Sequence, residues 1–240
     1  MYSPTIILEA MINGLLTGGI YAMIALGLTL VYGVLHIINF AHGTMLAAAM
    51  FAVLGLNMLT GISPYASIVI LAPVFFALGY GLQRYLIGPA SHGDEGNILL
   101  ITLGLSILIE NALLAGFGSD TRAISSDFSF AIVEAGPFLI SAPKLVGFIG
   151  SVVVSAGFWF LMNRTDAGKA IRAVAKEKFG ASLMGIDVRH IYALTFGLGC
   201  AALAIAAGLL MPTFYVNPRV GGAFISIAFT IVVLGGMGSI

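Results

Sequence analysis

The sequence predicts an all-α, polytopic integral membrane protein, built as a bundle of about seven transmembrane helices. Composition is the first reason: of 240 residues, 60% are hydrophobic and 8% are charged, whereas a soluble domain carries about 25% charged residues. The second reason is that the apolar residues form continuous runs. A transmembrane β-barrel strand would instead alternate at every second residue, so helices are the predicted spanning elements.

Seven segments are long enough to cross a bilayer, because spanning about 30 Å of hydrocarbon takes roughly 20 apolar residues. They lie at about 6–34, 37–59, 63–87, 98–118, 144–163, 190–212 and 221–240. Glycine fills 31 positions, about twice its average share, which predicts closely packed helices. We expect one transmembrane domain over residues 1–240. Since the last run ends without a polar tail, we also expect that a C-terminal part of the natural protein is missing.

The polar connections predict the orientation. Six of the ten basic residues lie in the connection 164–189, and the positive-inside rule places that connection in the cytoplasm. Alternation then places the connection 119–143 and the N-terminus outside; a break at 39–43 would move the N-terminus inside. A β-favouring run at 128–133 predicts a small hairpin in the external connection.

The cytoplasmic connection contains the one long helical pattern outside the spans. Its apolar residues recur every three or four positions and are Ile171, Val174, Ala175, Phe179, Leu183 and Met184. This spacing predicts a short amphipathic helix that is broken near Gly180. The pattern alone leaves two interpretations open. The helix lies on anionic membrane lipid, or its apolar face docks on a cytosolic partner.

Three stretches resemble the branched-chain amino-acid (Liv-type) permease subunits of ATP-binding-cassette importers. They are IYAMIALGLTLVYGVLHIINFAHGTML at 20–46, GKAIRAVAKEKFGASLMGIDV at 168–188 and GGAFISIAFTIVVLGGMGSI at 221–240. The resemblance implies a multi-pass permease of the bacterial inner membrane. Its implied partners are a second homologous permease, a periplasmic solute-binding protein and cytosolic ATPase subunits. Members of this family continue beyond the GGMGS stretch.

The same resemblance implies that the connection 164–189 is the segment that couples the permease to the ATPase. The residues it assigns to this contact are Lys169, Ile171, Arg172, Val174, Ala175, Phe179, Leu183, Met184 and Gly185. The implied solutes are leucine, isoleucine and valine. A mostly neutral pathway would also suit amides or urea.

Polar residues inside the apolar runs are candidates for the solute pathway, because a charged group near the centre of a transmembrane helix costs roughly 2.5–3.5 kcal/mol. They are Asn39, His42, Glu110 and Asn111. Each has a structural alternative: Glu110 reaches water near the external end of its helix, and His42 bonds a backbone carbonyl at a helix junction. Arg219 lies in an irregular external or re-entrant segment, where it meets either solvent or a carboxylate of the solute or of the delivery protein.

Two further features point to helix packing. Gly14 and Gly18 have the GxxxG spacing of closely packed membrane helices, and we expect them to contact the second permease. Cys200 is the single cysteine, so a disulfide within the chain is excluded and the side chain is expected to pack between helices.

Several function classes are disfavoured. Zero net charge provides no basic surface for nucleic acid. The single Gly-Lys pair, Gly168 with Lys169, is followed by Ala170 and does not form a P-loop, so ATP hydrolysis must lie on a separate chain. No grouping of residues has metal-ligand spacing, and no cofactor is expected. The alternative to an importer permease is an ion-gradient-driven secondary transporter or channel for small neutral solutes.

Overall fold

The protein forms a helical bundle in a computed structural model that describes residues 4–91, 95–124, 127–135 and 138–236. Its α-helices are α1 Pro4–Leu35, α2 Ala41–Thr60, α3 Pro64–Gly81, α4 Gly88–Ser91, α5 Glu95–Phe117, α6 Ala142–Arg164, α7 Asp166–Lys176, α8 Lys178–Leu183, α9 Val188–Leu210 and α10 Val220–Leu234. Within this described part, six helices are long and apolar enough to cross a membrane. The all-α, polytopic membrane fold is therefore confirmed.

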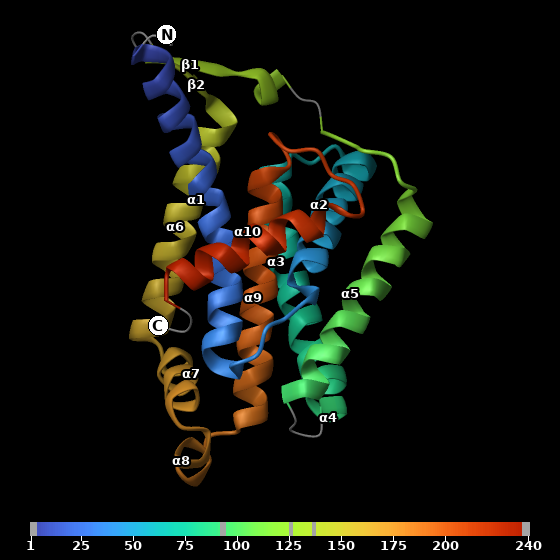
Figure 1. The fold of residues 1–240 in the computed structure, drawn as a ribbon, viewed down its shortest axis with the longest axis vertical. Helices are drawn as coiled ribbons and strands as arrows, with labels where there is room; N and C mark the ends of the chain where they lie inside the picture. The colour runs from blue at the N-terminus through green and yellow to red at the C-terminus, as the bar shows by residue number, and fades with distance from the viewer. Residues whose placement is uncertain (1–3, 92–94, 125–126, 136–137, 237–240) are drawn as a thin grey trace.

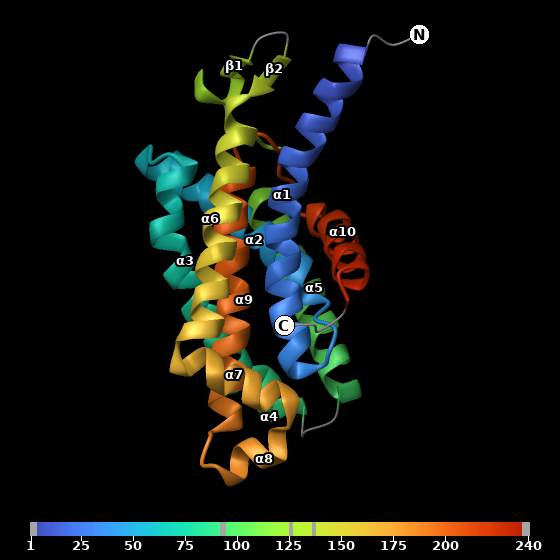
Figure 2. The same cartoon turned by 90° about the vertical axis from the view of Figure 1, so that its left-hand side faces the viewer.

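Most of the connections lie at two opposite ends of the bundle. Figures 1 and 2 show the start of α1 and the hairpin at one end, and α4, α7 and α8 at the other. The connection 119–143 thus shares an end with the start of α1, while 164–189 lies opposite. This is the arrangement expected from simple alternation of the spans.

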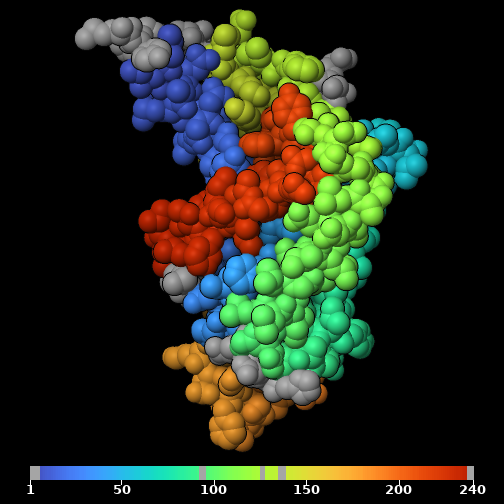
Figure 3. Space-filling view, turned by 45° about the vertical axis from the view of Figure 1, so that its right-hand side comes forward, coloured from blue at the N-terminus to red at the C-terminus, as the bar shows by residue number. Residues whose placement is uncertain are grey.

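The segment predicted as a seventh span is shorter than a membrane crossing. Helix α10 has 15 residues, about 22 Å at 1.5 Å per residue, against about 30 Å of hydrocarbon. Gly235 caps α10, and Gly236 follows with a φ of 84°; residues 237–240 lie outside the described part. The helix runs obliquely across the bundle (Figure 1), and on the surface it starts next to α5 and leads away from it (Figure 3).

The core is centred on α9, which packs against α1, α2 and α3. Glycines allow these helices to approach: an added Cβ at Gly199 would lie 2.7 Å from Cγ2 of Val31, and one at Gly79 would lie 2.6 Å from Sγ of Cys200. Cys200 is buried, with its Sγ 3.7 Å from Sδ of Met45. The predicted close packing is confirmed, and Cys200 lies between helices as expected.

Two local features differ in detail from the sequence-based expectations. The third span continues from α3 through a π-helical turn, Leu82–Ile87, into α4, so it ends at Ser91. The predicted hairpin consists of β1 Ile132–Ala135 and β2 Phe138–Ser141, paired antiparallel. The 3₁₀ turn Asp127–Phe130 takes up the start of the β-favouring run, so the strands lie farther along the chain than the run itself.

Candidate functional site

The connection between α1 and α2 leaves the helical conformation inside the bundle. His36 has a φ of 56°, which ends α1, and Figure 1 shows the connection returning to the middle of the bundle before α2 begins. Asn39 is buried, and its Oδ1 accepts a hydrogen bond from the Ala41 amide at 3.0 Å. This side chain satisfies a backbone donor that the first turn of α2 would otherwise leave unpaired.

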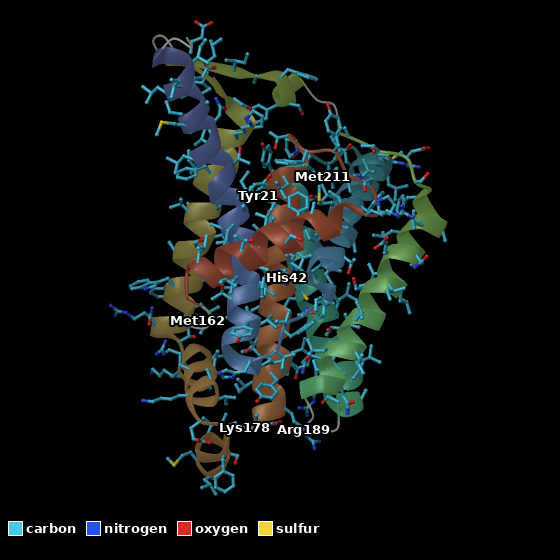
Figure 4. The ribbon with its side chains drawn as sticks, in the orientation of Figure 1. Tyr21, His42, Met162, Lys178, Arg189 and Met211 are labelled. Carbon is cyan, nitrogen blue, oxygen red and sulfur yellow. The ribbon has the colours of Figure 1, made fainter. Side chains whose placement is uncertain are left out.

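His42 is the second residue of α2 and is fully enclosed (Figure 4). Its Nε2 is 3.1 Å from the carbonyl oxygen of Ile24 in α1, and because a carbonyl only accepts, Nε2 must carry the proton. The ring also packs against Gly27, where an added Cβ would lie 3.3 Å from Cε1 of His42. His42 and Asn39 thus bond to the backbone, in the geometry expected of a helix junction.

Helices α2 and α10 cross at two glycines. An added Cβ at Gly221 would lie 2.6 Å from the carbonyl oxygen of Gly43, and an added Cβ at Gly43 would collide with the carbonyl oxygen of Gly221. The crossing joins the first and the last of the three family-like stretches. It brings Arg219, two residues before Gly221, next to α5.

A row of polar contacts connects α5 to this crossing. The Thr44 hydroxyl of α2 donates to Oγ of Ser106 at 3.3 Å. One turn farther along α5, Oε1 of Glu110 lies 3.6 Å from Nε of Arg219. Residues four apart lie on one helix face, so Ser106 and Glu110 both face α2 and the start of α10.

Glu110 therefore has a partner that the sequence did not predict. Seven residues separate it from Phe117, the end of α5, a distance of about 10 Å along the helix. The carboxylate of Glu110 contacts Arg219 at this position along α5. It therefore does not depend only on water at the end of the helix. Asn111 is exposed and donates to the carbonyl of Ile107 in its own helix, outside this row.

The first half of the 164–189 segment is anchored in the bundle. Ile171 and Val174 of α7 are buried, and α7 packs against α1, α6 and α9. Arg172 donates to the carbonyl of Met162 and to Oδ1 of Asn163, both near the end of α6. These three residues were expected to face a partner, but their side chains contact this chain.

The second half carries the exposed apolar surface. Helix α8 begins after Glu177, which has extended backbone and accepts from the Phe179 amide at 2.9 Å. The predicted break near Gly180 therefore lies at Glu177, because that side chain caps a new helix. Phe179, Leu183 and Met184 each expose more than two thirds of their surface; we call these three residues the α8 patch.

The remaining residues assigned to coupling surround these two parts. Lys169 pairs with Asp166 at 3.0 Å on the exposed side of α7, and Ala175 is half-buried. Gly185 has a φ of 83° and ends the α8 turn, a conformation that favours glycine. It directs the chain toward α9.

A polar cluster that the sequence analysis missed ties α9 to α3 near the α8 patch. Oδ1 of Asp187 accepts from the His190 amide at 3.1 Å, and Oδ2 lies 3.5 Å from Nη1 of Arg84. The amide of His190 and then the charge of Arg84 hold the pKa of Asp187 below its ordinary value. The Tyr80 hydroxyl is 2.9 Å from Nδ1 of His190. These two contacts join residues 103 and 110 positions apart in sequence, which no local pattern could predict.

Gly14 and Gly18 have open space beside them among the residues that the structure describes. A Cβ added at either position would meet nothing within 4 Å, whereas one added at the neighbouring Gly19 would collide with Phe148 of α6. The GxxxG face is therefore available, and its packing against a second permease stays a prediction.

A cavity of about 590 Å³ lies away from the polar row. It is bounded by α1, α6, α7 and the end of α10, and its walls are mostly apolar, with Phe158, Trp159 and Ile231 among them. Arg172 borders it. Asn39, His42, Glu110 and Asn111 do not line this cavity.

Comparison with known proteins gives consistent matches along the chain. Residues 10–240 match the family described as branched-chain amino acid transport system / permease component. The high-affinity branched-chain amino acid transport system permease protein BraD of Pseudomonas aeruginosa is 34% identical over 97% of this chain and 80% of its own length. The high-affinity branched-chain amino acid transport system permease protein LivH of Escherichia coli is 33% identical over the same shares.

A more distant relative has the same kind of name. The probable branched-chain amino acid transport permease protein LivH of Methanocaldococcus jannaschii is 28% identical over 94% of this chain and 73% of its own length. No solved structure matches. The family match over nearly the whole length, together with six helices of the described residues that are long and apolar enough to cross a membrane, shows that the chain belongs to the branched-chain amino acid transport system permease family, as a multi-pass permease subunit of the inner membrane.

Proposed function

We propose that the chain is one of two permease subunits of an ATP-binding-cassette importer that moves branched-chain amino acids across the inner membrane. A periplasmic binding protein delivers the solute, and ATP is hydrolysed on separate cytosolic ATPase chains. The names of the relatives support the solute class. The observation that carries the coupling role is the combination of a buried α7 and an exposed apolar patch on α8.

A buried α7 followed by an exposed α8 patch would let this segment transmit force from a partner to the helical bundle. Three adjacent apolar side chains on a short polar-flanked helix provide the surface that a groove on another protein would bind. Force applied to the α8 patch would reach the bundle through α7, where Ile171 and Val174 are buried. Gly185 and Asp187 continue the same segment into α9, and the Asp187 to Arg84 contact extends it to the π-helical turn after α3.

The polar row of α2, α5 and α10 is the proposed solute pathway. Glu110 belongs to that row, and Asn111 lies outside it. Asn39 and His42 serve the pathway indirectly, because their backbone bonds hold the start of α2 inside the bundle. Discontinuous helices whose ends meet inside the membrane are a common feature of solute sites in transporters.

The coupling role is tested by changing the α8 patch alone. Phe179→Asp should reduce association of the ATPase and ATP-driven leucine uptake by about tenfold or more, because it removes an apolar contact and adds a charge to the interface. Membrane insertion should be unchanged. Ala173→Asp is the matched control, because it adds the same charge on the exposed side of α7 without removing an apolar side chain.

Retained association in Phe179→Asp would contradict the docking role. Ile171→Asp is unsuitable for this test, since it would place a charge in the core. Uptake by the reconstituted complex should require ATP and favour leucine over urea; uptake driven by an ion gradient without ATP would instead identify a secondary transporter.

A further inference from the structure

The Glu110 to Arg219 pair combines opposite charges at a place where each is expensive. Both lie on elements that approach each other, α5 and the segment leading into α10. A single charge in a membrane needs a partner or water. This pair meets that need within the chain, yet the two side chains are 36% and 78% exposed. They are paired but not enclosed.

The surroundings of the pair are open on one side. Figure 3 shows the surface hollowed beneath α10 and beside α5, with residues from the first quarter of the chain at the back of the hollow. Phe40 precedes Thr44 by one helical turn and is 42% exposed. Since Thr44 bonds Ser106 of α5, Phe40 continues the α5-facing side of α2.

We propose that Glu110 and Arg219 recognise the zwitterionic head group of the transported amino acid. Arg219 binds the solute carboxylate and Glu110 binds its ammonium group. The Ser106 and Thr44 hydroxyls lie on the next turn, and the aliphatic side chain of the solute extends toward Phe40. This inference rests on the proposed function and assigns its solute contacts.

The chemistry of the pair matches that head group. A guanidinium binds a carboxylate through parallel N–H donors, and a carboxylate accepts from an ammonium group. In the absence of solute, the two side chains satisfy each other. When an α-amino acid arrives, each charge exchanges one partner for another of the same sign, so no charge is left unpaired at any stage.

The same arrangement discriminates by charge. Urea and simple amides carry neither group, so they would have to separate the pair without replacing either partner. A site built for charged partners rejects ligands that lack them, because its own polar groups are then left unpaired. The pair therefore favours α-amino acids among small solutes.

A purely mechanical role for the pair makes a different prediction. A latch that only holds α5 against α10 needs two opposite charges in either order. Recognition of the head group needs each charge in its own position, because exchanging them would reverse the solute and direct its side chain away from Phe40. Exchange of the two residues separates these roles.

The experiment uses the complete importer in proteoliposomes, with ATPases, partner permease and binding protein, and measures radiolabelled leucine delivered per ATP hydrolysed. Glu110→Gln and Arg219→Gln should each lower this ratio by about tenfold or more. ATP hydrolysis stimulated by the loaded binding protein should stay within about twofold of the unaltered complex. Arg219→Lys keeps the charge and should recover part of the ratio.

The matched control is Asn111→Ala, next to Glu110 but bonded to its own helix, which should leave the ratio unchanged. The exchange variant Glu110→Arg with Arg219→Glu should stay as low as the single variants. Recovery in the exchange variant would overturn recognition in favour of a latch. Normal ratios in the single variants would overturn both roles for the pair. If the unaltered complex takes up no leucine, the proposed function itself is wrong, and the assignment of solute contacts is wrong with it.

Discussion

Gly43 and Gly221 lie back to back where α2 crosses α10, although 178 residues separate them in sequence. Neither position has room for a side chain, so the backbones themselves are in contact. This contact fixes the start of α10 against the start of α2. The Glu110 to Arg219 pair, two residues away along the α10 segment, depends on that placement.

Gly43→Ala should destabilise the protein and disturb the crossing, because the added methyl group meets backbone that cannot rotate away. Overpacking of this kind costs typically 1–3 kcal/mol, so the thermal unfolding midpoint of the purified protein should fall. Leucine uptake should fall with it, since Arg219 would move relative to Glu110.

Gly55→Ala is the matched control for this change. Gly55 lies in the same helix, and an added Cβ there would meet nothing within 4 Å. Alanine in an open helical position is favoured over glycine by up to about 1 kcal/mol, so this midpoint should stay level or rise. Equal midpoints for the two variants would show that the crossing tolerates a side chain.

The sequence was sufficient to predict the six helices of the described residues that can cross a membrane, because a run of about 20 apolar residues has few alternatives in a bilayer. It did not predict that α10 is too short to be a seventh. A break at 39–43 was among its alternatives, but the contacts that hold this helix junction inside the bundle could not be predicted. The start of α2 depends on the His42 bond to Ile24 and on the glycine crossing. These contacts are remote in sequence and leave no periodic pattern.

The coupling segment shows the same limit at the level of single residues. Ile171 and Phe179 have equivalent places in the four-residue pattern, but Ile171 is buried and Phe179 is exposed. The reason is the break at Glu177, which separates one amphipathic pattern into two helices with different surroundings. Periodicity identifies an apolar face; only the tertiary structure determines whether this chain or a partner covers it.

Asp187 should make a small, pH-dependent contribution to the stability of the α9 start. Its folded-state pKa is lowered, first by the His190 amide and then by Arg84, so the stabilisation is complete above the ordinary carboxyl pKa of about 3.9. It is lost as the pH falls through the lowered folded value. The unaltered protein should therefore unfold at a higher temperature than Asp187→Asn at pH 6.

That difference in midpoint should shrink as the pH falls below about 4, where protonation removes the negative charge from Asp187. Asparagine can still cap the helix, so the comparison isolates the charge. A difference that stays constant from pH 6 to pH 3 would contradict the assigned role of the carboxylate.

The orientation of the bundle can be tested with single cysteines, since the one natural thiol, Cys200, is buried and should give little background. We expect Glu134→Cys, in the exposed strand β1, to react with a membrane-impermeant maleimide in intact cells. Lys178→Cys, at the start of α8, should react only after the membrane is permeabilised, because basic connections stay in the cytoplasm. Labelling of Lys178→Cys should rise by about tenfold or more on permeabilisation, because the intact membrane blocks the reagent. Reaction of Lys178→Cys in intact cells would place the α8 patch on the wrong side of the membrane for an ATPase, and the coupling role would then be untenable.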